Sequence, residues 1–479
     1  MSTELTYTPA TELVARIRRG TLSPVTLLEA CLERIDALDD EINAFVTVRD
    51  DDALAEAERA EAAVESGEPI GPLHGIPVAI KDLTQVAGVR TTYGSTLFSE
   101  NVSETDDPLV ERLRAAGAIV IGKTNTPEFG RKPMTVNEVA GATANPWNTT
   151  RTAGGSSGGS AAALAAGMVP IAQGSDAAGS IRIPASACGV YGLMPDFGRV
   201  PLGSRPDAFV NTHPYTFVGP MTRSVEDAAL VLDVIAGPHP DEPFSLPERS
   251  GQYVESVRAG VDDLEIAYSP DLGVCAVDSA VQDVVADAAD GFREAGATVD
   301  RIGSGFDDWE TPHDAIETLL QDRYLGLYDN LRRDEGIDLL DRREEVTAEV
   351  ISRIEKALEL TPLDVRRAER DRTVAFDAIN DIFEEYDVLV TPTLGMAPFE
   401  KETKPTSIAG ESIDPLHGWA LTWPLNLTGH PAASVPAGFV DGLPVGLQIV
   451  APRGRDDRVL AASAAFERVR PWSYPPNEL

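Results

Sequence analysis

The groups best suited to chemistry gather in two segments rich in glycine and serine. Gly154–Ser160 reads GGSSGGS, and Gly174–Arg182 reads GSDAAGSIR. Residues of these types present backbone N–H groups and hydroxyls on loops that lead into helices, and such loops bind negatively charged groups. The two segments therefore predict an anion-binding loop or a nucleophilic serine.

Two well-known motifs fit the first segment poorly. A phosphate-binding P-loop needs GxxxxGK[ST], and no lysine lies within either segment. A GxSxG nucleophile elbow matches Gly154–Gly158 around Ser156, but an elbow should follow a strand, and Asn148–Ala153 (NTTRTA) is polar and unlike a strand. A Ser-His-Asp mechanism also needs a placed histidine. None of the six candidates stands out from its loop or its Gly and Pro neighbours: His74, His213, His239, His313, His417 and His430.

A lysine offers a third kind of base. Lys81 directly follows the apolar run of HGIPVAIKDL, so we expect its amine at a buried strand end. Burial lowers the pKa of a lysine because the charged form loses its hydration. The neutral amine could then accept a proton from a serine hydroxyl.

These segments resemble the amidase signature family, whose catalytic set is Ser–cis-Ser–Lys. The resemblance is carried by GGSSGGSAAALAAG, GSIRIPASACGVYGL and IKD. It continues along the chain through Gly122–Gly130, Gly219–Gly237, Asp387–Thr393, Pro424–Pro436 and Gly442–Pro452. Agreement of so many segments in the same order is more specific than any single motif.

The resemblance implies catalytic roles for three residues. The family's lysine falls on Lys81, its cis-serine on Ser156 and its nucleophile on Ser180, at separations of 156 − 81 = 75 and 180 − 156 = 24 residues. Lys81 would take a proton from Ser156, and Ser156 would take one from Ser180. Ser180 would attack the amide carbonyl and form an acyl-enzyme that water hydrolyses. The resemblance implies no metal and no cofactor.

The loop before the expected nucleophile is the expected source of oxyanion donors. Backbone N–H groups of Ala177, Ala178 and Gly179 could stabilise the negative oxygen of the tetrahedral intermediate. Gly130 is a further expected substrate-binding position. The family's TDTGGS is here Ser175–Ser180 (SDAAGS), so an alanine replaces a glycine. If that position needs a positive φ, the alanine would be strained.

Neighbouring residues have structural interpretations. We expect Ser157 and Ser160 to cap the helix that follows them. We expect Asp176 to accept backbone hydrogen bonds, Arg182 to pair with a carboxylate, and Cys188 to be a small buried residue. Three tryptophans could line a substrate pocket or pack in the core: Trp147, Trp419 and Trp423.

Strands and helices alternate along the chain around these segments. A helix at Pro108–Ala116, a stop at Gly117 and a strand at Ala118–Ile121 form one such unit. The pattern predicts an α/β fold, an amidase-signature α/β/α sandwich whose mixed, largely parallel central sheet is covered by helices. We expect one amidase domain over 1–479, with a signature core at about 65–240 and a helical, cap-like region at about 305–375.

Composition restricts the partners and the environment. The formal net charge is 40 − 77 = −37, which disfavours binding to nucleic acid or to anionic membranes. Only six lysines occur, and this acidic, lysine-poor surface indicates work in concentrated salt, as in a halophilic archaeon. The N-terminus lacks a signal-peptide pattern, no apolar run of about 18 residues occurs, and the three cysteines form no CxxC pair, so we expect a cytoplasmic protein.

The predicted function is hydrolysis of carboxylic amides to a carboxylate and ammonia or an amine. One alternative is the amidase (glutaminase) subunit of a tRNA-dependent amidotransferase, which usually carries a stretch like RRIFLGTFALSSGYY; Arg353–Arg366 (RIEKALELTPLDVR) lacks it. Another is a non-catalytic binding protein on the same scaffold. The expected partner is a small-molecule amide, and a homodimer is compatible with the sequence. Specificity is expected in loops near Phe129–Met134 and His417–Leu425.

Overall fold

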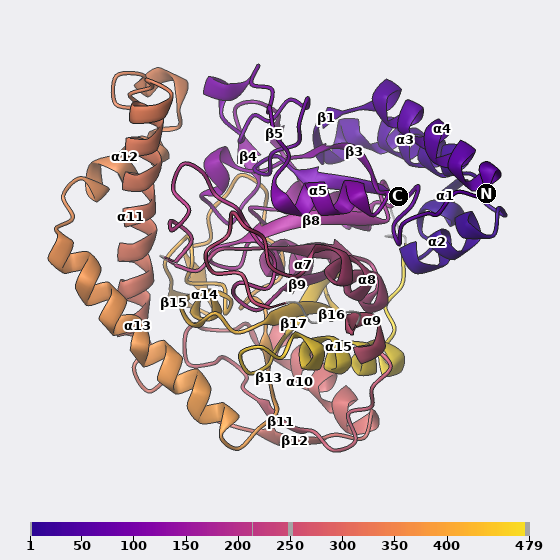
Figure 1. The fold of residues 1–479 in the computed structure, drawn as a ribbon. Coiled ribbons are helices and arrows are strands. Elements are labelled where there is room, and N and C mark those ends of the chain that lie inside the picture. The colour runs from indigo at the N-terminus through magenta and orange to yellow at the C-terminus, as the bar shows by residue number, and fades with distance from the viewer. Residues whose placement is uncertain (1, 213, 248–251, 475–479) are drawn as a thin grey trace.

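A large mixed sheet forms the centre of the computed structural model, which describes residues 2–212, 214–247 and 252–474 (Figure 1). In spatial order its strands are β1 (Phe45–Val48), β3 (Ile119–Thr124), β2 (Pro77–Lys81), β8 (Ile171–Asp176), β10 (Phe217–Thr222), β9 (Tyr191–Met194), β16 (Ala432–Val440), β17 (Leu443–Val450), β13 (Val388–Pro392), β11 (Glu265–Tyr268) and β12 (Thr298–Arg301). The predicted α/β class with a mixed central sheet is confirmed.

The parallel pairs of this sheet lie in two blocks. One block is β3, β2 and β8, and the other is β13, β11 and β12. The strands between the blocks pair antiparallel, as does β1 at the edge. Because β2 and β8 are parallel neighbours, their carboxyl ends lie at the same edge of the sheet. Lys81 ends β2 there, and Gly174–Arg182 contains the end of β8 and leads into α7.

Helices cover the sheet along its width (Figure 1). In chain order they are α1 (Ser2–Thr6), α2 (Ala10–Arg18), α3 (Pro24–Ile42), α4 (Asp50–Ser66), α5 (Pro108–Ala115), α6 (Gly158–Ala165), α7 (Arg182–Cys188), α8 (Val225–Ile235), α9 (Tyr253–Ser256), α10 (Ser279–Glu294), α11 (Glu310–Asp334), α12 (Ala348–Ala357), α13 (Pro362–Phe383), α14 (Trp423–Thr428) and α15 (Asp456–Val469). Helix α6 contacts β2, β3 and β8, whereas α10 and α15 contact each other and β16, β17 and β13.

Local sequence signals explain several element boundaries. Ser23 begins α3 by accepting hydrogen bonds from the backbone N–H groups of Val25 and Thr26, at 3.0 and 3.3 Å. The turn between β16 and β17 places Asp441 at φ 51° and Gly442 at φ 79°. Positive φ at both central residues is typical of a tight hairpin, and an Asp-Gly pair is the sequence signal of such a turn.

Helices α11, α12 and α13 form a separate group beside the sheet, drawn in orange at the left of Figure 1. Helix α11 contacts both α12 and α13, and α11 and α13 also contact α14. Buried side chains from α11 and α12, among them Tyr324, Tyr328 and Ile354, form a small apolar cluster of their own. The division of the chain into a signature core and a cap-like region stays a prediction.

The prediction that Asn148–Ala153 is unlike a strand is wrong. Asn148–Thr152 is strand β7, which pairs antiparallel with β6 (Ala144–Asn145) outside the central sheet. Similar short ribbons are β4 (Val136–Asn137) with β5 (Gly141–Ala142) and β14 (Ser407–Ile408) with β15 (Glu411–Ser412). The three threonines of β7 are β-branched, which favours extended backbone although their hydroxyls make the segment polar.

Among the described residues, no helix has the length and apolar character that crossing a bilayer requires.

Candidate active site

A cavity of about 540 Å³ lies at the carboxyl edge of β2 and β8, and it collects most of the residues predicted from the sequence. Its lining includes Ser156, Ser180, Ala177, Ala178 and Gly130. Lys81 lies behind this wall with no exposed surface, and Gly179 is not part of the lining. A volume of this size is in the usual range for small-molecule sites, about 300–1,000 Å³.

Lys81 ends the fully buried strand β2, as the apolar run before it predicts. Its Nζ donates to Oγ of Ser156 at 2.7 Å and to Oγ of Ser175 at 2.9 Å. Burial lowers the pKa of Lys81 to about 7, against a smaller opposing effect of the Asp176 charge. The amine is therefore held against a serine hydroxyl and can be neutral near neutral pH.

Ser156 lies in the loop between β7 and α6, directly after a cis Gly155–Ser156 peptide. The loop is tightly enclosed, because a Cβ on Gly155 would lie 2.8 Å from backbone atoms of Met134. A Cβ on Gly130 would lie 2.4 Å from Leu83 and 3.5 Å from Ser156 Oγ. Gly130, which has a φ of 68°, thus leaves open the space beside the Ser156 hydroxyl.

Ser180 lies in the turn between β8 and α7 and lines the same cavity as Ser156. The backbone N–H of Ser157 donates to its carbonyl oxygen at 3.2 Å, which joins the two Gly/Ser segments. Within the described parts of the chain, no hydrogen bond joins the hydroxyls of Ser156 and Ser180. Hydrogen bonds of a catalytic set often tighten only when substrate is bound.

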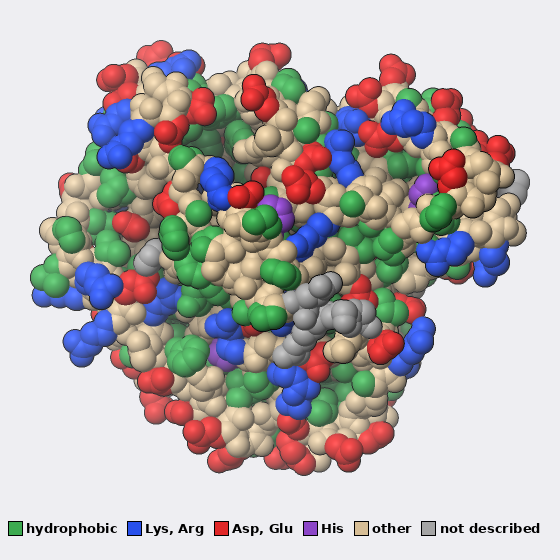
Figure 2. All heavy atoms as spheres, viewed as in Figure 1, with side chains coloured by type: hydrophobic (Ala, Val, Ile, Leu, Met, Phe, Trp, Pro, Cys, Tyr) green, Lys and Arg blue, Asp and Glu red, His purple; other side chains and the backbone are tan. Residues whose placement is uncertain are grey.

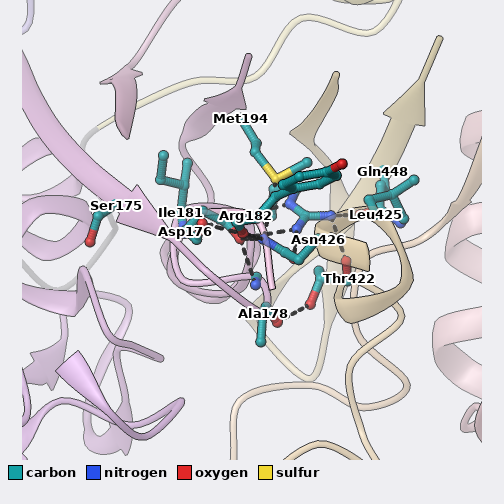
Figure 3. A network of polar contacts seen from close by, with 12 residues as sticks. Ser175, Asp176, Ala178, Ile181, Arg182, Met194, Thr422, Leu425, Asn426 and Gln448 are labelled. Carbon is teal, nitrogen blue, oxygen red and sulfur yellow. Dashed lines mark hydrogen bonds and ion pairs between the residues drawn. The ribbon is translucent and has the colours of Figure 1, made fainter. Parts of the chain in front are cut away.

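A buried ion pair organises the turn that carries Ser180 (Figure 3). Asp176 accepts hydrogen bonds from the backbone N–H groups of Gly179 and Ile181, at 2.6 and 3.1 Å. Its carboxylate also pairs with Arg182 at 3.1 Å, with neither side chain exposed. Burial alone would raise the pKa of Asp176, but the Arg182 charge and these hydrogen bonds bring it below the ordinary value. The expected roles of both residues are confirmed.

Arg182 extends this network to distant parts of the chain. Its guanidinium donates to the carbonyl oxygen of Thr422 at 2.9 Å, to Gln448 Oε1 at 2.7 Å and to Asn426 Oδ1 at 2.7 Å. Asn426 in turn donates to the Asp176 carboxylate at 2.9 Å. Figure 3 shows these groups gathered around the guanidinium. The loop before Ser180 is therefore fixed from both sides, which preorganises any donors it presents.

The three expected oxyanion donors differ in the hydrogen bonding of their backbone N–H groups. The Gly179 N–H is already used by Asp176, whereas no partner is found among the described residues for the N–H groups of Ala177 and Ala178. Neither alanine has a positive φ, so the departure from the family's glycine brings no backbone strain. Gly179 itself has a φ of 116°, and a Cβ there would lie 2.0 Å from Thr422 Oγ1.

The prediction that Ser157 and Ser160 cap the following helix is wrong. Neither side chain caps α6. Ser157 Oγ donates to the carbonyl oxygen of Ser175 at 3.3 Å, and Ser160 Oγ donates to that of Gln173 at 2.8 Å. Because the start of α6 is buried against β8, backbone groups of that strand are closer partners than the helix's own N–H groups.

Cys188 is fully buried, and burial raises the pKa of its thiol, so the expectation of a structural cysteine is confirmed. Trp419 and Trp423 are each 1% exposed, do not line the cavity and pack in the interior. The ring of Trp147 contacts that of Phe439 at a centroid distance of 4.8 Å.

The sequence did not predict the contact of Ser175 with Lys81, nor the wall of the cavity that α11 and α12 form. Ser175 lies in β8, directly before its last residue Asp176. Its position in the SDAAGS segment is the sequence signal that could have identified it. The missed wall comes from α11 and α12, through Leu320, Arg323, Tyr324 and Arg353. The loops expected to set specificity do contribute Phe129–Pro133 and His417.

Known proteins resemble this chain over nearly its whole length. The family described as Amidase matches residues 26–460. An acylamidase of Rhodococcus erythropolis is 41% identical over 98% of this chain and 97% of its own length. A glutamyl-tRNA(Gln) amidotransferase subunit of Chloroflexus aggregans is 36% identical over 98% of both chains. The crystal structure of a bacterial aryl acylamidase of the amidase signature enzymes superposes with a TM-score of 0.93 at 36% identity, over 97% of each chain.

The fold, the serine-rich cavity and these relatives define the class of protein: the chain is a hydrolase that acts on amide C–N bonds. It belongs to the amidase family, in the group of amidase signature enzymes.

Proposed function

We propose that this amidase hydrolyses carboxylic amides through an acyl-enzyme on Ser180, with Ser156 and Lys81 as its proton relay. The proposal depends mainly on the 2.7 Å contact between Lys81 Nζ and Ser156 Oγ, made by a lysine whose burial lowers its pKa to about 7. Ser180 shares the cavity with Ser156 and can therefore meet the same substrate.

In this mechanism Ser180 Oγ attacks the amide carbonyl while its proton passes to Ser156 and a proton of Ser156 passes to Lys81. The N–H groups of Ala177 and Ala178, which have no partner among the described residues, stabilise the oxyanion. The relay then protonates the leaving nitrogen, and ammonia or an amine departs. Water attacks the acyl group by the same route, which returns the proton to Ser180.

The test of this function is release of ammonia by the chain alone. We expect turnover of simple aliphatic and aromatic amides in concentrated KCl, clearly above a background measured with Ser180→Ala. Activity that appears only with glutamine and added partner proteins would instead support the amidotransferase alternative, which the relative of that name suggests. If neither the simple amides nor glutamine with added partner proteins is turned over above the background, the result would support the alternative of a non-catalytic binding protein.

The pH profile of the reaction should follow the Lys81 amine. Only the neutral amine can accept a proton, and the pKa of Lys81 is about 7. We therefore expect kcat/KM to rise about tenfold per pH unit below that value and to level off above it. The measurement is kcat/KM for one neutral amide from pH 5 to 9 at fixed KCl concentration. A profile that is flat, or that falls as the pH rises through 7, would contradict this role of Lys81.

We further propose that the enzyme works in the cytoplasm of a salt-adapted cell, in keeping with a halophilic archaeon. The net charge of −37 and the six lysines support this environment. Acidic side chains are distributed over the face shown in Figure 2. A homodimer stays a prediction, and binding to nucleic acid or to a membrane is not expected.

A further inference from the structure

Two arginines on the cavity wall lack an acidic partner among the described residues. Arg131 directly follows Gly130, and Arg323 lies in α11; both line the cavity that contains Ser156 and Ser180. Within the part of the chain that the structure describes, neither guanidinium has a carboxylate within ion-pair distance, and no carboxylate contributes to the environment of either. Two cationic groups thus face the substrate space without a counter-charge from these residues.

The protein holds both guanidinium groups in place with neutral contacts. Arg131 donates to the carbonyl oxygen of Arg323 at 3.1 Å and stacks over the ring of Tyr324, 4.2 Å from its centroid. Tyr324 returns a hydrogen bond from its hydroxyl to the carbonyl oxygen of Arg131 at 3.3 Å. Arg323 donates to the hydroxyl of Thr216. The pair is therefore fixed in position while its charge stays uncompensated.

Arg131 and Arg323 lie close to the catalytic loop. Thr216 directly precedes Phe217, which pairs with Asp176 at the end of β8. Ala177, an expected oxyanion donor, is the next residue after Asp176. On the other side, Arg131 adjoins Gly130, where an added Cβ would lie 3.5 Å from Ser156 Oγ. A group bound between the two arginines would therefore belong to a substrate whose amide reaches the serines.

A third arginine of the same wall provides a contrast. Arg353 pairs with Glu317 at 3.1 Å, and Glu317 also contacts His417 Nδ1 at 2.8 Å. These charges lower the pKa of Glu317 to about 2, although burial alone would raise it. The described fold thus supplies a carboxylate to one arginine of this wall and leaves the other two without one.

The remaining acidic residues of the cavity contact groups other than Arg131 and Arg323. Asp106 pairs with Arg114 at 3.4 Å, and Asp241 pairs with Arg205. Asp107 accepts a hydrogen bond from the backbone N–H of a neighbouring loop residue, Gln85, at 2.9 Å. Glu111 lies 3.6 Å from His239. None of these contacts joins the acids to Arg131 or Arg323.

An uncompensated arginine pair is unexpected in a chain with 77 acidic and 40 basic residues. Arginine does not lose its proton readily, so a partly buried guanidinium without a counter-charge is costly to the fold. Burial lowers the pKa of Arg323 to about 9, with the Arg131 charge acting in the same direction. A bound anion would relieve this cost, and paired guanidinium groups match the two oxygens of a carboxylate.

We propose that Arg131 and Arg323 bind a carboxylate on the substrate, so that the preferred substrates are amides that carry a second, anionic group. This inference rests on the proposed amide hydrolysis and adds the substrate class. The carboxylate could belong to the acyl part, as in the monoamide of a dicarboxylic acid, or to the leaving amine, as in an N-acyl amino acid. Both arrangements use the same arginine pair, and the choice of substrates distinguishes them.

The experiment compares matched amides at one KCl concentration. Adipamic acid is paired with hexanamide, and N-acetyl-β-alanine with N-propylacetamide, so each pair differs by a carboxylate in place of a methyl group. We expect wild-type kcat/KM to favour the anionic member of at least one pair by about tenfold or more. Preference in the first pair assigns the carboxylate to the acyl part, and preference in the second assigns it to the amine.

Arg131→Gln and Arg323→Gln should each reduce that preference by roughly tenfold, through KM for the anionic amide, while turnover of the neutral amide persists. Arg333→Gln, at the exposed end of the same helix α11, is the charge-matched control and should leave the preference unchanged. Because either cavity variant could fail to fold, adipate binding to Ser180→Ala is measured by calorimetry in the same buffer.

Two results would overturn the inference: wild type without preference for either anion, or folded Arg131→Gln and Arg323→Gln variants that keep the full preference. Absence of adipate binding to Ser180→Ala together with no preference for adipamic acid would exclude the acyl-side arrangement. Neutral amides hydrolysed by wild type but not by Ser180→Ala would show that the proposed function stands even if the carboxylate inference fails. If wild type hydrolyses no amide at all, the proposed function fails, and adipate binding then tests the arginine pair on its own.

Discussion

Ser180→Ala is expected to lower kcat/KM for a neutral amide by about 10⁴-fold or more, because loss of the nucleophile removes the acyl-enzyme route entirely. The substitution deletes one hydroxyl that has no hydrogen bond within the described residues, so the thermal midpoint should change little. The measurement is ammonia release from hexanamide in concentrated KCl, followed by intact-protein mass spectrometry for an acyl adduct, which only wild type should form.

Ser186→Ala is the matched control for that loss. Ser186 lies on α7, directly after the Ser180 turn, and is 2% exposed without lining the cavity. Its removal should leave kcat/KM within a few-fold of wild type. If Ser180→Ala retained more than a tenth of wild-type activity, or if the adduct mapped to Ser156, the nucleophile would have to be reassigned.

Signals that are local in the chain predicted much of the fold and the centre of the site. The apolar run before Lys81 indicates a buried strand end, and β2 does end there with all its residues buried. The Asp441-Gly442 pair indicates a hairpin, and both residues adopt the positive φ that such a turn requires. In each case the information lies within a few residues, which is why a single sequence suffices.

Other features depend on contacts that a single sequence does not contain. Arg131 and Arg323 meet across 192 residues of chain, and Arg323 reaches Thr216 across 107. Ser175 contacts Lys81 only because β8 pairs with β2. Helix periodicity predicts that α11 exists but not which cavity it closes. The arginine pair therefore became visible only once the helices were placed.

The errors near the site have different physical causes. Ser157 and Ser160 have the residue type of helix caps, but burial of the start of α6 against β8 offers them other acceptors. The polarity of Asn148–Thr152 argues against a strand, whereas its β-branched side chains favour extended backbone in a short ribbon. Strain at Ala178 would need a positive φ, which the loop adopts only at Gly179. Tertiary packing thus overrides the capping preference of Ser157 and Ser160, whereas Asn148–Thr152 follows the local preference of its threonines for extended backbone.

Lys81→Arg should inactivate the enzyme while the fold persists. Arginine keeps a positive charge at this position but cannot lose its proton at neutral pH, so it cannot accept one from Ser156. We expect kcat/KM for hexanamide to fall by about 10³-fold or more across pH 6–9, without the rise that the wild-type amine should give near its pKa of about 7. Circular dichroism and the dependence of the thermal midpoint on KCl concentration would show whether the fold and its salt response are retained.

The chain offers the same substitution at a second buried lysine as a control. Lys123 lies on the neighbouring strand β3, where it is paired in register with Ile80, but it does not line the cavity. Its Nζ contacts Asp82 at 3.5 Å and donates to Thr91 Oγ1 at 2.7 Å. An arginine can keep the ion pair with Asp82, so Lys123→Arg should retain activity if it folds, whereas Lys81→Arg should not.

Equal loss in both folded variants would mean that a buried arginine in this sheet is harmful in itself. Retained activity in Lys81→Arg would mean that another group is the base. Loss confined to Lys81→Arg is expected only if the reaction needs an amine that can release its proton.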